Sequence, residues 1–251
     1  MVLLMAGTNA LLAPRGDGGT GARAEIHRAQ LFDLVGAATH ATDLPLPALE
    51  ARFPALAKAV RGAGPYYQPW VNDTLEQSKA LTAADTLNAN QAVFSDWMGL
   101  VTRHPGLYAL TRWPVFWWTL ATPDVSRCHP AFAGVEGDPA QITALGLKAQ
   151  IRPQDRWLGS YARAFMGTPL LSHLPFLAAA MGFLSLLLRR RRPADLAMAG
   201  LLGGGLVFTA SFFVVSIACD YRYVEFVDFA ALTAGFYYAT SRQPAEDGAK
   251  K

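Results

Sequence analysis

The chain has 251 residues, of which 52% are hydrophobic, and a formal net charge of +3 at pH 7. This length suits one domain with a membrane anchor, and the small net charge argues against a nucleic-acid partner. The two cysteines lack the spacing of a metal site or a redox pair, and the five histidines are scattered. We therefore expect no metal and no cofactor.

Residues 1–21 are expected to form an apolar stub and a linker. The first thirteen residues are apolar but too short to cross a membrane, and they lack the basic leader of a signal peptide. The stretch RGDGGTG that follows favours turns. Since the domain that follows is expected outside the cytoplasm, the chain is interpreted as the C-terminal part of a longer protein. Insertion as a hairpin from the C-terminal side is the alternative.

Residues 22–167 are expected to form a mostly helical domain. Apolar residues at helical spacing, with prolines at the breaks, predict helices over 23–38, 44–60 (interrupted near Pro54), 84–103, 139 onward and 154–165. On the first helix, Gln30 and Asp33 are expected to face solvent. No segment alternates for long enough to predict a strand.

Two aromatic segments in this domain have two interpretations each. The loop GAGPYYQPWV (62–71) carries Tyr66, Tyr67 and Trp70, which could line a substrate surface or fill a small core. The segment GLYALTRWPVFWWTL (106–120) has Arg112 as its only charge. Its aromatic rings suit either the lipid headgroup level or a packed helix interface.

The last third of the chain predicts three transmembrane helices. About twenty apolar residues in a helix span the hydrocarbon layer. Three mostly apolar stretches cover 169–188, 195–219 and 223–240, and Thr168-Pro169 is expected to begin the first of them. The predicted fold is therefore mainly α, an integral membrane protein with an N-terminal helical domain outside the cytoplasm.

The basic residues predict the orientation of these helices. Arg189 to Arg192 form the densest positive cluster, and short basic loops stay cytoplasmic. The C-terminal tail (241–251) is then cytoplasmic, and everything before Thr168 is outside. Arginine outnumbers lysine, and alanine and glycine are abundant, which suits a GC-rich bacterial genome and hence a bacterial inner membrane with a periplasmic domain.

Several residues near the outer membrane face could interact with partners. Cys128 and Cys219 would both lie outside, where a disulfide between them could persist; two free thiols are the alternative. Gly200 and Gly204, four residues apart, could let the helix of a membrane partner approach, or could pack against the chain's own helices. The ionisable residues at that face are Asp220, Arg222, Glu225 and Asp228.

Three segments resemble the C-terminal region of bacterial polytopic glycosyltransferases of the GT-C type, which use polyprenyl-phosphate sugars. They are His104-Pro105 with Tyr108 and Arg112, Thr168-Pro169 before a span, and Cys219-Asp220-Tyr221-Arg222-Tyr223 before the last span. The resemblance covers about 91–239. It implies transfer of a sugar from a polyprenyl-phosphate donor at the outer face of the inner membrane. That family carries its catalytic carboxylate in an early outer loop, which this sequence lacks, so catalysis by this chain alone is not expected.

Two groups of residues are the candidate site. Arg222 can hold the lipid phosphate through two parallel hydrogen bonds, with Tyr221 and Tyr223 beside it. The same arginine could instead form a structural salt bridge with Glu225 or Asp228. The candidate acceptor surface consists of Tyr66, Tyr67, Trp70, His104 and Arg112. The alternative function is a non-catalytic, membrane-anchored domain that binds a membrane partner.

Overall fold

The computed structural model describes residues 19–78, 81, 87–128, 134–135, 137, 139–166 and 168–241. These residues are mainly helical and contain no strand beyond two isolated bridges, which confirms the predicted mainly α class. The predicted N-terminal stub and most of the predicted cytoplasmic tail lie outside the described residues. The α-helices are α2 (Gly19–His40), α3 (Pro47–Arg52), α4 (Pro54–Gly62), α5 (Asp73–Glu76), α7 (Asn90–Arg103), α8 (Pro105–Ala121), α9 (Val125–Cys128), α10 (Pro139–Ala144), α11 (Pro153–Phe165), α12 (Leu174–Arg190), α13 (Pro193–Val215) and α14 (Glu225–Thr240). Four 3-10 turns are η1 (Gly64–Tyr66), η3 (Leu87–Ala89), η4 (Pro169–Leu171) and η5 (Tyr221–Tyr223).

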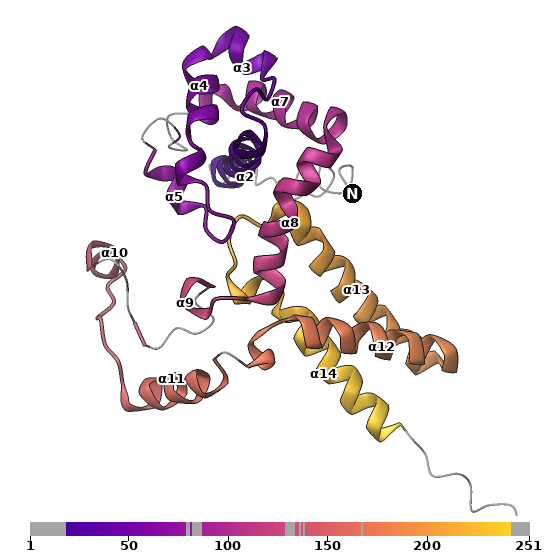
Figure 1. The fold of residues 1–251 in the computed structure, drawn as a ribbon. Coiled ribbons are helices and arrows are strands. Elements are labelled where there is room, and N and C mark those ends of the chain that lie inside the picture. Colours follow the sequence, from indigo (N-terminus) through magenta and orange to yellow (C-terminus); the bar gives the residue numbers. More distant parts are fainter. Residues whose placement is uncertain are drawn as a thin grey trace, which may run out of the picture. The chain divides into compact units, whose positions relative to one another are not determined.

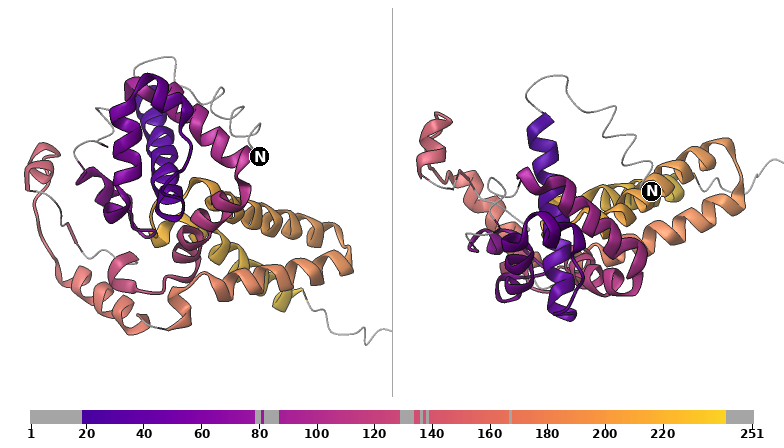
Figure 2. Two further views of the ribbon diagram at one scale, coloured as in Figure 1. Left: turned by 45° about the horizontal axis from the view of Figure 1, so that its top comes forward. Right: turned by 90° about the horizontal axis from the view of Figure 1, so that it is seen from above.

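The chain divides into two compact units, residues 1–115 with 213–218 and residues 116–212 with 219–251. The division falls within α8 and α13, so each of these helices contributes to both units. In the first unit, α2 is packed against α4 and α7, and α3 packs against α4 and α7 in turn. Figure 1 views α2 nearly along its axis with these helices around it, and Figure 2 gives two further directions.

Helix α2 is buried on the side that the sequence predicted to be solvated. Its apolar residues Leu31, Phe32, Leu34 and Val35 are almost completely buried, and so are Gln30 at 5% and Asp33 at 1% exposure. Helices α4 and α7 pack against α2 and exclude these two side chains from water. The prediction of a solvated face was therefore wrong for Gln30 and Asp33.

Prolines and one buried carboxylate determine the short helices α3 and α4. The sequence predicted one helix over 44–60 with an interruption near Pro54, and the structure has two helices there. Each begins at a proline, where the missing N–H loses no hydrogen bond. The first N–H groups of a helix have no partner inside it. In α3 the carboxylate of Asp96, from α7, accepts from the N–H groups of Ala48 and Leu49 at 3.0 and 2.9 Å. This contact attaches α3 to α7.

Helices α12, α13 and α14, which lie mostly in the second unit, correspond to the three predicted membrane segments. The first prediction, 169–188, was wrong at its start: residues 169–171 form the turn η4, and α12 begins only at Leu174. Helix α13 is long and apolar enough to cross a membrane, and it is the one helix of the described chain that meets this criterion. Helices α12 and α14 have 17 and 16 residues, or roughly 25 Å each.

Small apolar residues hold these three helices together. Ala180 on α12, Leu202 on α13 and Ala230 and Ala234 on α14 are buried in one cluster, and α12 and α14 lie side by side along their length. Asp195, in the first turn of α13, has a buried carboxylate that pairs with Arg190, at the end of α12, at 3.2 Å. The same carboxylate accepts a hydrogen bond from the Tyr237 hydroxyl at 2.7 Å. Of the four consecutive arginines, Arg190 thus helps to hold α12 and α13 together through this ion pair.

Candidate functional site

A buried polar cluster in the second unit lies at the N-terminal ends of α12 and α14, away from the arginine run. His173 precedes the first residue of α12, and Asp228 lies in the first turn of α14. The backbone N–H of His173 donates to the carbonyl of Leu120, at the end of α8, at 2.9 Å. Since α12 and α14 pack side by side, their first turns bring the two side chains together.

His173 and Asp228 make a close pair that Tyr221 completes. Nδ1 of His173 lies 2.8 and 3.0 Å from the two carboxylate oxygens of Asp228. The hydroxyl of Tyr221 donates to the same carboxylate at 2.9 Å, and its ring centroid is 4.1 Å from that of the imidazole. The His173 side chain is completely buried.

This arrangement assigns the proton positions on the histidine. A carboxylate accepts hydrogen bonds, so Nδ1 carries the proton that points at Asp228. Burial and the nearby charge of Asp228 raise the pKa of Tyr221, so its hydroxyl stays protonated and donates as well. Nε2 of His173 is buried and has no hydrogen-bond partner in the described chain. An imidazole that is oriented by a carboxylate and whose second nitrogen makes no hydrogen bond can act as a base toward a ligand hydroxyl that reaches it.

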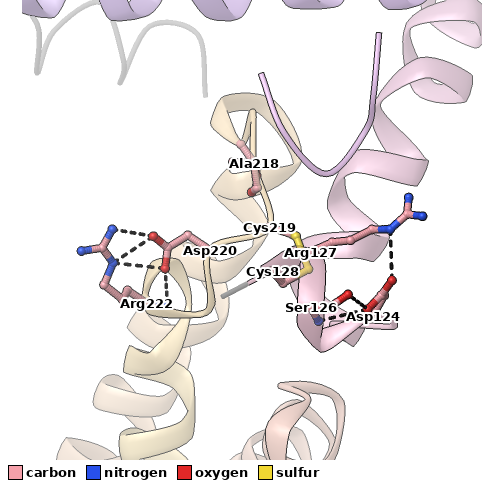
Figure 3. The surroundings of a disulfide bond; sticks show 9 residues. Asp124, Ser126, Arg127, Cys128, Ala218, Cys219, Asp220 and Arg222 are labelled. Carbon is pink, nitrogen blue, oxygen red and sulfur yellow. Dashed lines mark hydrogen bonds and ion pairs between the residues drawn. A yellow bond between two sulfur atoms is a disulfide. The ribbon is translucent and has the colours of Figure 1, made fainter. Parts of the chain in front are cut away.

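A disulfide between Cys128 and Cys219 lies beside this cluster, as the sequence analysis suggested (Figure 3). The two Cα atoms are 5.0 Å apart, and both residues are almost fully buried. Cys219 is two residues before Tyr221. The bond therefore attaches the segment that carries Tyr221 to the end of α9.

The three residues predicted to contact a lipid phosphate do not converge on one point. Arg222 is exposed and pairs with Asp220 through its Nε and Nη2 atoms, with Nε 3.0 Å from Oδ2. Figure 3 shows this pair beside the disulfide. Tyr221 points to Asp228, and Tyr223 stacks on Phe212 with centroids 5.7 Å apart. Arg222 thus forms an ion pair with Asp220, its neighbour two residues earlier.

The first unit separates the residues predicted as an acceptor surface. Tyr66 is 40% exposed and His104 is exposed at the end of α7, while Trp70 is half-buried. Tyr67 is turned inward against Phe32, with ring centroids 4.8 Å apart.

Arg112 is completely buried, which excludes it from any surface, so this prediction was wrong. Its Nη1 lies 2.8 Å from Oδ1 of Asp33, and its Nε donates to the carbonyl of Phe213 at 2.6 Å. Trp97 donates to the other carboxylate oxygen at 2.8 Å. Burial raises the pKa of Asp33 and the charge of Arg112 opposes this. The sequence alone shows no link between these residues, because Asp33 and Arg112 are 79 positions apart.

An apolar groove of about 510 Å³ runs between α12 and α14. It begins at Leu170 and Pro175, on either side of His173 in the sequence, and continues past Phe183 to Phe236. Its walls carry no charged side chain. Volumes of this size are typical of ligand pockets. The groove suits a hydrocarbon chain.

Sequence reasoning missed His173 as a functional candidate. Its only signal was a histidine and a serine between two prolines at the start of an apolar run. Among the described residues, no three histidine, cysteine or carboxylate side chains gather where they could hold a metal ion. Comparisons with protein-family models, curated proteins and solved structures find no match for this chain.

Proposed function

We propose that α12, α13 and α14 cross a membrane. The supporting observation is the large apolar surface that these helices expose, including Val207 at 70%, Phe229 at 63% and Phe236 at 74%. Burying such surface is worth about 25 cal/mol per Å², so leaving it in water is costly. The sequence has no charged residue over 174–188 or 196–219. Charges therefore lie only at the helix ends, as in a bilayer.

The same proposal puts the arginine run in the cytoplasm and the His173 cluster outside, in the periplasm of a bacterium. Short basic loops stay cytoplasmic. The Cys128–Cys219 disulfide, at the other end of α14 from the arginines, supports this orientation, because disulfides persist in oxidising compartments.

We propose further that this outer end binds a polyprenyl-phosphate sugar, as part of a glycosyltransferase-like protein. The observation that carries the proposal is the apolar groove between α12 and α14, whose lining residues Leu170 and Pro175 lie on either side of His173 in the sequence. The polyprenyl chain would occupy the groove. The phosphate would meet Arg222, and a hydroxyl of the sugar or acceptor would meet Nε2 of His173.

Asp220 does not prevent Arg222 from binding a phosphate. The Arg222 side chain is 68% exposed, and exposed ion pairs contribute only about 0–1 kcal/mol. A phosphate offers the guanidinium two parallel hydrogen bonds and more negative charge than one carboxylate. Asp220 would then orient Arg222 in the absence of ligand and compete with the phosphate for its guanidinium group.

Photolabelling tests this proposal. The full chain in proteoliposomes would be exposed to a polyprenyl phosphate with a photoreactive group on its chain. We expect labelled peptides from α12 and α14, and competition by polyprenyl phosphate but not by the uncharged polyprenol.

Arg222→Met and Arg222→Lys should each weaken this competition about tenfold, which corresponds to about 1.4 kcal/mol. Asp220→Asn should strengthen it, because it removes the competing carboxylate. Equal competition in all three variants would show that Arg222 is not a phosphate contact. Absence of labelling in the wild-type protein would contradict the lipid-binding function itself.

A second function, binding of a membrane partner, is favoured by the glycines of α13. A Cβ atom added at Gly200 or Gly204 would meet nothing within 4 Å, whereas one at Gly205 would meet Phe226 and Ala230 at 3.5 and 3.6 Å. Among the described residues, the first two glycines are therefore not packed against another helix, and small residues let a partner helix approach closely. A Gly200→Leu, Gly204→Leu double variant should lose cross-links to a partner in native membranes while keeping the photolabel.

A further inference from the structure

Helix α11 separates its aromatic residues from its arginines. At 3.6 residues per turn, successive residues are about 100° apart around a helix. Trp157, Leu158, Tyr161 and Phe165 therefore lie within one stripe. Their rings stack along it, with centroids 6.0 Å apart for Trp157 and Tyr161 and 4.9 Å apart for Tyr161 and Phe165. Arg156 and Arg163 lie on the opposite side of the helix.

The apolar stripe of α11 faces away from the rest of its unit. Trp157 is 67%, Tyr161 58% and Leu158 54% exposed. Gly159, roughly 200° from Trp157 around the helix, is its only buried residue. An amphipathic helix in water normally buries its apolar side. Here the side that packs is the small and polar one.

The residues around α11 continue the same pattern. Large apolar side chains before and after it are exposed, namely Leu145, Leu147, Ile151, Met166 and Leu170. Lys148 and Arg152 add basic charge just before the helix. Residues 145–170 thus combine exposed apolar side chains with a net positive charge, from four basic residues against Asp155.

We propose that α11 lies in the membrane–water interface, with its aromatic stripe among the acyl chains and its arginines at the phosphates of anionic lipids. Helices that lie on membranes have this composition: tryptophan and leucine on one side, arginine or lysine on the other. Arginine can place its charge at the phosphates while its stem covers apolar surface. The partner is a lipid surface and not a protein, since basic residues lie along the whole segment that carries the exposed apolar side chains.

The position of α11 in the chain also supports a lipid partner. Residues 166–173 are the only connection to α12, and eight residues reach at most about 30 Å. If α12 crosses the membrane, as proposed above, α11 ends close to the outer interface. The inference rests on that part of the proposed function.

Fluorescence quenching tests the inference in proteoliposomes that contain the full chain. The signal of Trp157 is the difference between the wild-type protein and Trp157→Phe. We expect lipids brominated near the glycerol end of their chains to quench this signal at least twofold more than lipids brominated near the chain ends. Quenching should be stronger in phosphatidylglycerol than in phosphatidylcholine.

The arginines are tested by Arg156→Gln with Arg163→Gln, with His40→Gln, an exposed histidine at the end of α2, as the control. The double variant should lose the preference for phosphatidylglycerol, and the control should keep it. An unquenched Trp157 in protein that still takes the polyprenyl photolabel would overturn this inference alone. A quenched Trp157 in protein that takes no photolabel would support it and contradict the phosphate site. A lipid preference unchanged in the double variant would also overturn it.

Discussion

Arg112 and Asp33 form an ion pair from which water is excluded, with side-chain exposures of 0% and 1%. Removing one partner of such a pair leaves a charge buried without compensation, which costs about 3–5 kcal/mol. We expect Arg112→Leu to lower the free energy of unfolding by that amount in denaturant titrations. Replacing both residues by leucine should cost less than Arg112→Leu alone.

A matched control for this prediction is Glu50→Gln. Glu50 pairs with Arg61 at a half-exposed position, where an ion pair is worth at most about 1 kcal/mol. A loss below 1 kcal/mol for Arg112→Leu would mean that Asp33 reaches water or another partner.

Gly36 on α2 allows a close approach that a larger residue would prevent. A Cβ there would lie 2.6 Å from Cγ2 of Thr111 and 2.7 Å from Cζ of Tyr67. Forcing atoms into a packed core costs about 1–3 kcal/mol, so Gly36→Ala should lower the free energy of unfolding by this amount.

Gly99 on α7 is the comparison, since a Cβ there meets nothing within 4 Å. Replacing a glycine inside a helix by alanine should stabilise the protein by about 0.5–1 kcal/mol. The two Gly→Ala changes are therefore expected to have opposite signs in the same thermal melts. Equal effects would show that the neighbours of Gly36 move aside.

At the scale of elements, the disulfide joins α9 to the segment before η5 across 91 residues of sequence. Cross-links of this kind usually stabilise proteins by about 2–5 kcal/mol, largely by restricting the unfolded chain. We expect reductant, or Cys128→Ser with Cys219→Ser, to lower the melting temperature of the detergent-solubilised protein. The double variant should not respond to reductant. An unchanged melting temperature would show that helix packing alone holds the Tyr221 segment.

Several helices begin where a proline in the sequence permits a helix to start. Pro139 begins a helix as expected, and prolines at residues 47, 54 and 153 also begin helices, because a first-turn proline loses no hydrogen bond. Pro169 lies in the turn η4, and α12 begins at Leu174, next to Pro175. The sequence has two prolines at which this helix could start, Pro169 and Pro175, and the packing of α12 on α14 decides between them.

For the whole molecule, the orientation in the membrane is the central prediction. On a background without the two cysteines, Tyr66→Cys should react with a membrane-impermeant thiol reagent in intact cells. Arg192→Cys should react only after permeabilisation. Both positions are exposed, so access to the reagent is not limited by the fold. Labelling of position 192 but not of 66 in intact cells would reverse the proposed topology.

The sequence by itself determined the helical class, the helix start at Pro139, and the confinement of charge to the ends of the last three helices. These properties are local, since they depend on proline positions and on apolar spacing over one or two turns. It also limited any disulfide to one pair, because the chain has two cysteines.

Only the tertiary structure decided which charges meet. Asp33 was expected in solvent and Arg112 on a binding surface, yet the two are buried together. His173 and Asp228, 55 residues apart, form a pair because α12 and α14 lie side by side. The physical reason is that burial and ion pairing depend on which helices pack together. The pattern of residues within one or two turns of a helix does not specify that packing.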